Sequence, residues 1–208
     1  MIGLSLTNIL GRFILFHEEV NYMIRVISGS AGGLKLQTLD ADSTKPTLDR
    51  VKEAAFSMLR DDIYGATVLD LFSGSGALGI EALSRGAKKC FFNDKSKACR
   101  DIIVKNLQHT NLYSLAEVSC ADYAEIIASF KKRGIVFDLI LIDPPYNSGF
   151  YTQTLELISK SHICADYCTV LCEHSAEDVL PDNIGDFYLY KTKKYGTVAV
   201  SIYRNEVD

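Results

Sequence analysis

From residue 66 onward, the chain alternates between short apolar runs and longer segments whose apolar positions have helical spacing. The apolar runs predict strands at 66–71, 89–93, 115–119, 137–142 and 167–173. The amphipathic segments predict helices at about 77–85, 96–109, 122–132 and 150–160. Strands that alternate with helices in this way are typical of a doubly wound, Rossmann-like parallel α/β sheet.

The end of the chain interrupts this alternation. Two further strand-like runs, 187–194 and 197–204, are separated only by Tyr195 and Gly196. So short a connection requires an antiparallel pair, because a parallel crossover needs a dozen or more residues. The sheet is therefore predicted to be mostly parallel and to be closed by a C-terminal antiparallel hairpin.

A smaller unit is predicted before the main sheet. Residues 23–28 and 34–37 flank a glycine-rich turn, which predicts a β-hairpin. Pro46 then opens a helix, with Thr47 as its expected cap. The expected division is an N-terminal extension at 1–22, a hairpin-and-helix annex at 23–62 and the main α/β domain at 63–208.

The composition is that of an ordinary globular protein. The 208 residues are 48% hydrophobic and 23% charged, which suits one large domain with a small appendage. The net charge of −4 gives no global attraction to nucleic acid, so any RNA binding must rest on a local basic surface. No apolar run reaches the ~18 residues that span a bilayer, and the N-terminus lacks a signal-peptide pattern. We expect a cytoplasmic protein.

Six scattered cysteines fit a reducing cytoplasm better than a disulfide framework. Three of them lie in a segment that is rich in metal-ligand types, namely His162, Cys164, Cys168, Cys172 and His174. Its spacing contains neither a Cys-x2-Cys pair nor a tight His-x3-His. Cys168 and Cys172 fall in a predicted buried strand that Cys164 precedes, so we expect inert thiols and no bound metal.

A glycine-rich turn follows the first strand of the main domain. Gly74, Gly76 and Gly79 satisfy the dinucleotide fingerprint, which favours NAD with its pyrophosphate at the helix N-terminus. Asp70, however, ends the strand four residues before the first glycine. A carboxylate there is poorly placed beside a pyrophosphate. It is well placed for a cationic ligand such as S-adenosylmethionine (SAM).

Further acids follow the next strands. Asp94 closes the second strand and can accept both ribose hydroxyls of an adenosine, whether that of NAD or that of SAM. Asp122, after the third strand, can accept from an adenine amino group or cap the following helix, and both roles can hold together. Glu81, in the helix after the glycine turn, is interpreted as an acid that compensates the helix dipole.

The most distinctive motif is Asp143-Pro144-Pro145-Tyr146. The apolar run 139–142 precedes it, and the prolines stop the strand because neither can donate to a sheet. An acid, a rigid turn and an aromatic ring thus stand at the carboxyl end of a central strand, where α/β sheets bind ligands. This set suits a planar amine such as the exocyclic NH2 of a nucleobase. A purely structural turn is the alternative.

In this order the motifs resemble the class I SAM-dependent methyltransferases, and among them the amino-methylating group marked by Asp/Asn-Pro-Pro-aromatic. The whole pattern is similar to the bacterial 16S rRNA guanine-N2 methyltransferase family of RsmD type. The matching segments are 25–29, 34–36, 45–53, 69–79, 143–146 and 196–199. The resemblance implies methyl transfer from SAM to N2 of a guanine in 16S rRNA, within the small ribosomal subunit or its assembly intermediate. Nothing in it requires a metal or more than a monomer.

The resemblance also implies roles for individual residues. Asp143 and the carbonyl of Pro144 would each accept one N–H of the amine, and Tyr146 would stack on the base. The catalytic turn as a whole is Asp143, Pro144, Pro145 and Tyr146. The cofactor-binding residues are expected to be Asp70, Phe72, Gly74, Gly76, Ala77, Asp94, Lys95, Asp122 and Tyr123. The RNA-binding residues are expected to be Arg25, Lys35, Lys45, Arg50 and Lys52.

Two features depart from that family. Gly32 and Leu34 stand where its hairpin usually carries arginines, so the grip on RNA is expected to lean on the polar face of the annex helix. Arg50 or Lys52 would contact phosphate there. Family members tend to begin near residue 23, and we expect 1–22 to reflect an upstream start codon rather than a lineage-specific extension. Further basic candidates are Lys191, Lys193 and Lys194.

Three other functions are compatible with parts of the pattern. A DNA adenine-N6 methyltransferase would share the catalytic turn, but the chain has no room for a separate DNA-recognition domain. An NAD oxidoreductase fits the glycine turn and leaves Asp70 and the Asp143 turn unexplained. A non-catalytic RNA-binding module would use SAM only structurally or not at all.

Overall fold

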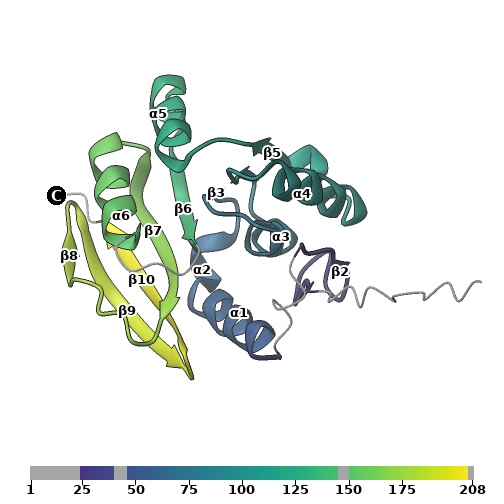
Figure 1. The fold of residues 1–208 in the computed structure, drawn as a ribbon, viewed down its shortest axis with the longest axis horizontal. Coiled ribbons are helices and arrows are strands. Elements are labelled where there is room, and N and C mark those ends of the chain that lie inside the picture. Colours follow the sequence, from purple (N-terminus) through teal and green to yellow (C-terminus); the bar gives the residue numbers. More distant parts are fainter. Residues whose placement is uncertain (1–23, 40–45, 145–149, 206–208) are drawn as a thin grey trace, which may run out of the picture.

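The computed structural model describes residues 24–39, 46–144 and 150–205 (Figure 1). Its large sheet has eight strands in the order β5-β4-β3-β6-β7-β10-β9-β8. The first five of these pair in parallel and the last three are antiparallel, which confirms the predicted sheet and its closing hairpin. The strands are β3 (Thr67–Asp70), β4 (Lys89–Asn93), β5 (Ala116–Ser119), β6 (Phe137–Ile142), β7 (Cys164–Ser175), β8 (Asn183–Ile184), β9 (Phe187–Tyr195) and β10 (Val198–Asn205).

Helices cover both faces of this sheet (Figure 1). One face packs against α1 (Pro46–Met58), α2 (Arg60–Ile63), α3 (Ala77–Ser84) and α4 (Lys97–His109). The other face packs against α5 (Tyr123–Arg133) and α6 (Phe150–Ser161). A 3-10 turn at Tyr113–Leu115 precedes β5. Every predicted element of the main domain is present within three residues of its predicted bounds. The sequence did not predict α2 and β8, because four and two residues are too few to show a period.

The N-terminal hairpin is shorter than predicted. Its strands are β1 (Ile24–Arg25) and β2 (Lys35–Leu36). The N–H groups of Ile27 and Ser28, just after β1, donate to the Glu81 carboxylate on α3, at 2.7 and 3.1 Å. Glu81 is fully buried and lies beyond the first turn of α3, so its interpretation as a dipole-compensating acid is wrong. It anchors the hairpin to the main domain.

The annex shares the core of the main domain. Val26 and Leu36 of the hairpin and Val51 and Phe56 of α1 belong to one buried cluster with Val68 of β3. The helix begins at Pro46, as predicted. The side chain of Thr47 is outside the described part of the chain, so its capping role stays a prediction. Residues 1–22, with the expected upstream start codon, lie outside the described residues.

Strand β7 differs from the prediction at its start. It begins at Cys164 rather than after it, with an irregularity that pairs Phe137 with Cys164 and Leu139 with Thr169. Cys168 and Cys172 are buried, as expected. In the described ranges, no group of three or more His, Cys, Asp or Glu residues is arranged to hold a metal. No helix in those ranges has both the length and the apolar character needed to cross a membrane.

Candidate active site

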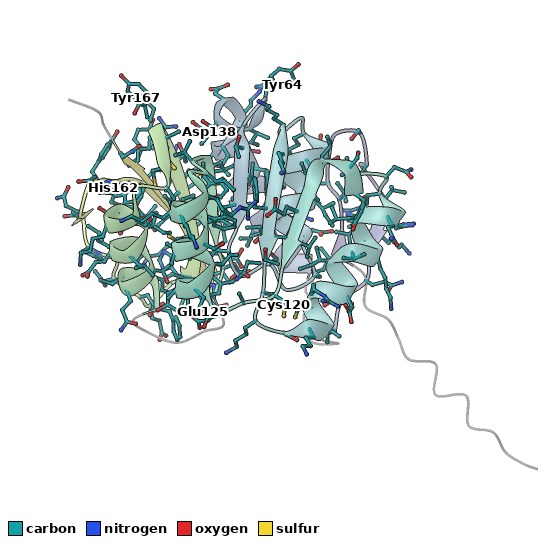
Figure 2. The ribbon with its side chains drawn as sticks, turned by 90° about the horizontal axis from the view of Figure 1, so that it is seen from above. Tyr64, Cys120, Glu125, Asp138, His162 and Tyr167 are labelled. Atoms are coloured by element: carbon teal, nitrogen blue, oxygen red, sulfur yellow. The ribbon has the colours of Figure 1, made fainter. Side chains whose placement is uncertain are left out.

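A cavity of about 600 Å³ opens at the carboxyl ends of the parallel strands. Its walls come from the segments after β3, β4, β5 and β6, from the end of β7, and from Ile24 and Lys52 of the annex. In Figure 2, Cys120 marks this end of the sheet, opposite Tyr64 and Asp138. The four predicted strand-end acids all line this one cavity: Asp70, Asp94, Asp122 and Asp143.

The glycine turn after β3 has a fixed shape. Gly76 caps α3 with φ of 81°, a left-handed conformation that glycine adopts without strain. Gly79 packs so closely on β4 that a Cβ atom there would lie 2.3 Å from the Phe92 ring and 2.8 Å from Cys90 Sγ. The third glycine of the motif therefore allows close packing of the helix on the strand, as in dinucleotide folds.

Asp70 distinguishes between the two cofactors that the glycine motif allows. Its Oδ2 accepts the N–H of Gly79, in the first turn of α3, at 2.9 Å. A pyrophosphate at this helix N-terminus would meet a carboxylate, which disfavours NAD. Its Oδ1 is buried and has no hydrogen-bond partner within the described part of the chain. A cationic group fits this oxygen, so the residues present fit the ammonium or sulfonium of SAM.

The pKa of Asp70 responds to the same environment. Burial raises it to about 7, the Gly79 hydrogen bond opposes the rise, and the charge of Asp94 adds to it. The pKa is therefore far above that of an ordinary aspartate. A cation bound at Oδ1 would lower it again, because an opposite charge favours the carboxylate.

Asp94 and Asp122 are both held by backbone N–H groups. Asp94 accepts from Gly74 through Oδ2 and from Ser96 through Oδ1, each at 2.9 Å. Each oxygen keeps a second lone pair, so the predicted ribose contact is compatible with these bonds and stays a prediction. Asp122 caps α5 by accepting the N–H of Ala124 at 2.9 Å, which confirms the capping role. Its contact with adenine also stays a prediction.

The acceptor turn lies on the same cavity. Asp143 and Pro144 line the wall, whereas Pro145 and Tyr146 lie outside the described residues, and their roles stay predictions. The pKa of Asp143 is well above its usual range because the group is buried and because Glu173 and Asp70 carry like charges nearby. The carboxyl group predicted to hold the amine and the acid predicted to hold the cofactor thus line the same cavity, close enough for their charges to interact.

Several residues that line the cavity were not predicted from the sequence, among them Phe150, Gln153 and Glu173. Glu173 had a usable signal, because an acid that closes a buried apolar run is the pattern that identified Asp70. Phe150 extends a row of aromatic rings. The centroids of the Phe150 and Tyr123 rings are 5.9 Å apart, and those of the Tyr123 and Phe72 rings are 5.7 Å apart. No local pattern marks Phe150 or Gln153, since only the fold brings the start of α6 to the cavity.

Comparison with known proteins identifies the family. A model of the family described as conserved hypothetical protein 95 matches residues 24–204. The chain belongs to this family, the RsmD-type class I SAM-dependent methyltransferases. Ribosomal RNA small subunit methyltransferase D of Escherichia coli (strain K12) is 32% identical to it over 183 residues, 88% of this chain and 90% of that protein.

Two further relatives of this RsmD-family chain agree. YlbH of Bacillus subtilis (strain 168), a candidate rRNA methyltransferase, is 37% identical over 181 residues, 87% of this chain and 98% of that protein. The solved structure of a candidate methyltransferase, yhhF of Escherichia coli, has a TM-score of 0.76 and 32% identity, and covers 89% of this chain and 99% of its own. The predicted methyltransferase fold is confirmed.

The basic residues predicted to bind RNA differ in their exposure in this methyltransferase. Arg25, Lys35 and Arg50 are exposed, although Arg25 pairs with Asp49 at 2.8 Å. Lys45 lies outside the described residues. On β9, Lys191 and Lys193 are exposed and pair with Ile202 and Val200, which belong to the cluster beneath α1. These two lysines therefore lie on the face of the sheet that α1 covers, whereas Lys194 points away and donates to the carbonyl of Ala176 at 2.8 Å.

Lys52 is not on the polar surface of α1, and that prediction is wrong. It is 5% exposed, because the hairpin and α3 cover its side of the helix. Its ammonium donates to the carbonyl of Arg25 and lies 3.6 Å from Glu81 Oε2. Burial lowers the pKa of Lys52 while Glu81 opposes the shift. Lys52 lines the cavity instead of the outer surface.

Proposed function

We propose that this chain transfers a methyl group from SAM to the exocyclic N2 amine of a guanine in the 16S rRNA of the small ribosomal subunit. One observation carries the proposal. Asp70, which fits a cationic cofactor, Asp94, which suits its ribose, and the Asp143-Pro144 turn all line a single cavity. The printed names of the relatives in Escherichia coli and Haemophilus influenzae, both ribosomal RNA small subunit methyltransferase D, support the choice of RNA.

The acceptor turn suits a nucleobase amine. The lone pair of guanine N2 is delocalised into the ring, so the nitrogen must pyramidalise before it can attack. Asp143 and the carbonyl of Pro144 each accept one N–H, which fixes the nitrogen and favours the positive charge that develops on it. SAM supplies an electrophilic methyl group when bound. Holding the amine in line with that methyl provides most of the acceleration.

The methylated nitrogen must then lose a proton. Asp143 accepts one of its N–H groups, and burial beside Glu173 and Asp70 raises the pKa of Asp143. A carboxylate with a raised pKa is a better proton acceptor than an ordinary aspartate. Asp143 therefore takes the proton and passes it to water as the product leaves.

The RNA approaches across the annex. A base must leave its stack to enter a pocket of this kind, and phosphate contacts hold the strand while it does so. Exposed cations at the annex and on β9 supply those contacts on a chain whose net charge is −4: Arg25, Lys35, Arg50, Lys191 and Lys193. We place this reaction in the cytoplasm, on a small subunit or its assembly intermediate, with one copy of the chain.

A single labelling experiment tests the proposal. The protein is incubated with methyl-labelled SAM and with small subunits from cells that lack the modification. Label in N2-methylguanosine supports it, and mapping the label gives the target position. Label in N6-methyladenine would favour an adenine methyltransferase. Tight SAM binding without transfer would favour a non-catalytic RNA-binding module.

A further inference from the structure

Glu173 is a buried acid to which the reaction above gives no contact with the substrate. It is 8% exposed, lies near the carboxyl end of β7 and lines the cavity. Its carboxylate makes no hydrogen bond or ion pair with any residue in the ranges 24–39, 46–144 and 150–205. Burial raises its pKa to about 7. An isolated buried carboxylate is costly, so its retention on a ligand cavity calls for a ligand that donates to it.

The sheet register places Glu173 beside Asp143, on the acceptor side of the cavity, where the methyl-accepting base is predicted to bind. Glu173 pairs with Val200 of β10 and lies two residues after Leu171 on β7. All three side chains are therefore on the face of the sheet that α1 covers. On β6, Leu139 and Leu141 are on this same face. Asp143 comes directly after the strand and continues their every-second-residue pattern. Strands β3, β6 and β7 are neighbours in that order, so Asp143 lies between Asp70 and Glu173. The acid of β7 is therefore one strand, about 4.8 Å, farther from the cofactor side than Asp143.

Few other groups compete for this carboxylate. Asp143 and Asp70 are like charges, and the charge of Glu173 contributes to the raised pKa of Asp143. The one cationic side chain on the annex wall of the cavity, among the residues described, is Lys52, and it lies on Glu81 and the Arg25 carbonyl. The neighbour on β10 is the apolar Val200. Glu173 is thus an acceptor that faces the space where the base would lie.

The edge of guanine matches two adjacent acceptors. Its N2 amine stands next to N1–H, so the two positions present donors side by side, whereas adenine carries an acceptor at N1. Resting on the function proposed above, we propose that Glu173 accepts the N1–H of the target guanine while Asp143 accepts from N2. Glu173 is then a specificity-determining residue that selects guanine over purines without that donor.

The test uses a base that keeps the 2-amine of guanine but lacks the N1–H donor. 2,6-Diaminopurine keeps the 2-amine of guanine but has a lone pair at N1. Small subunits are reconstituted on 16S rRNA that carries either base at the position mapped by labelling. The kcat/KM is measured for each at about pH 8.5, above the pKa of Glu173, so that its carboxylate accepts and cannot donate. The wild type is expected to favour guanine by about 100-fold or more, because the analogue leaves a buried acceptor unpaired. Glu173→Gln, whose amide can also donate to N1, is expected to narrow that preference to about 10-fold or less.

Controls keep this result apart from a loss of structure and from failure of the proposed function. Glu177→Gln makes the same change on an exposed residue four positions later and should leave the preference intact. SAM affinity of Glu173→Gln should match that of the wild type. If the wild type methylates guanine N2 and Glu173→Gln keeps the full preference, the role of Glu173 is wrong while the function stands. If the wild type puts no label on guanine N2, the proposed function itself fails.

Discussion

The two halves of the cavity hold their acids in different ways. On the cofactor side, each acid accepts a backbone N–H: Asp70 from Gly79, Asp94 from Gly74 and Ser96, and Asp122 from Ala124. On the acceptor side, the carboxyl groups of Asp143 and Glu173 make no hydrogen bond to another described residue. The main chain thus preorganises the cofactor half, whereas ligand donors must orient the acceptor half. Substitutions in the first should change binding or stability, and those in the second should change turnover.

The largest effect is expected at Asp143. Asp143→Ala removes an acceptor that acts on the charge developing at the amine, so methyl transfer should fall by about 10³-fold. SAM affinity, measured by calorimetry, should survive, because the cofactor half does not depend on this side chain. Asp143→Asn is the matched control, since its amide oxygen still accepts an N–H and should keep part of the activity. Equal loss of transfer and of SAM binding in the alanine variant would contradict the division between the halves.

Packing beneath the cofactor half gives the next effect. In an open helix, replacing glycine by alanine stabilises by ~1 kcal/mol. At Gly79 the new Cβ would lie 2.3 Å from the buried Phe92 ring, so α3 must shift on β4. Gly79→Ala should therefore destabilise by ~2–3 kcal/mol and weaken SAM binding, because the N–H that orients Asp70 moves with the helix. Urea unfolding and calorimetry measure the two effects. A stabilised variant would show that the close packing is not required.

These two sites also show what the sequence could predict. Asp70, Gly79 and Asp143 were found because each ends a strand or opens a helix, and the carboxyl ends of parallel strands must share an edge. The placement of Lys52 was wrong because helical spacing identifies a polar face but not what covers it. Here the hairpin, tied to α3 through Glu81, lies over that face. Long-range packing of this kind has no local period, and the same limit hid Phe150 and Gln153.

A smaller effect is expected at Asp94. Asp94→Ala removes the carboxylate that accepts from Gly74 and Ser96 and that is predicted to take the ribose hydroxyls. SAM affinity should fall by about 10- to 100-fold, because the loss of one hydrogen bond to a charged group costs ~1.5–3 kcal/mol. Asp101→Ala, at an exposed position on α4, is the control. Unchanged affinity in the Asp94 variant would remove the ribose assignment.

The smallest effect is a dependence on pH: stability without SAM should fall as the pH rises, whereas SAM affinity should increase. Burial raises the pKa of Asp70 and of Glu173 to about 7. The folded protein thus holds protons that the unfolded chain releases near pH 4, and stability from these groups is lost as the pH rises toward 7. Between about pH 5.5 and about pH 8, the melting temperature without SAM should fall. Asp70→Asn and Glu173→Gln should each flatten that fall.

SAM binding should respond in the other direction. A cation at Oδ1 of Asp70 favours the ionised carboxylate, so SAM affinity should increase over the same pH range and offset the loss of stability. Two variants then distinguish the cofactor half of the cavity from the acceptor half. Asp70→Asn should remove the pH dependence of SAM affinity, whereas Glu173→Gln, one strand beyond Asp143, should leave most of it in place. If both variants removed it equally, Asp70, Asp143 and Glu173 would titrate as one coupled group, and the distinction between the cofactor and acceptor sides would have no electrostatic basis.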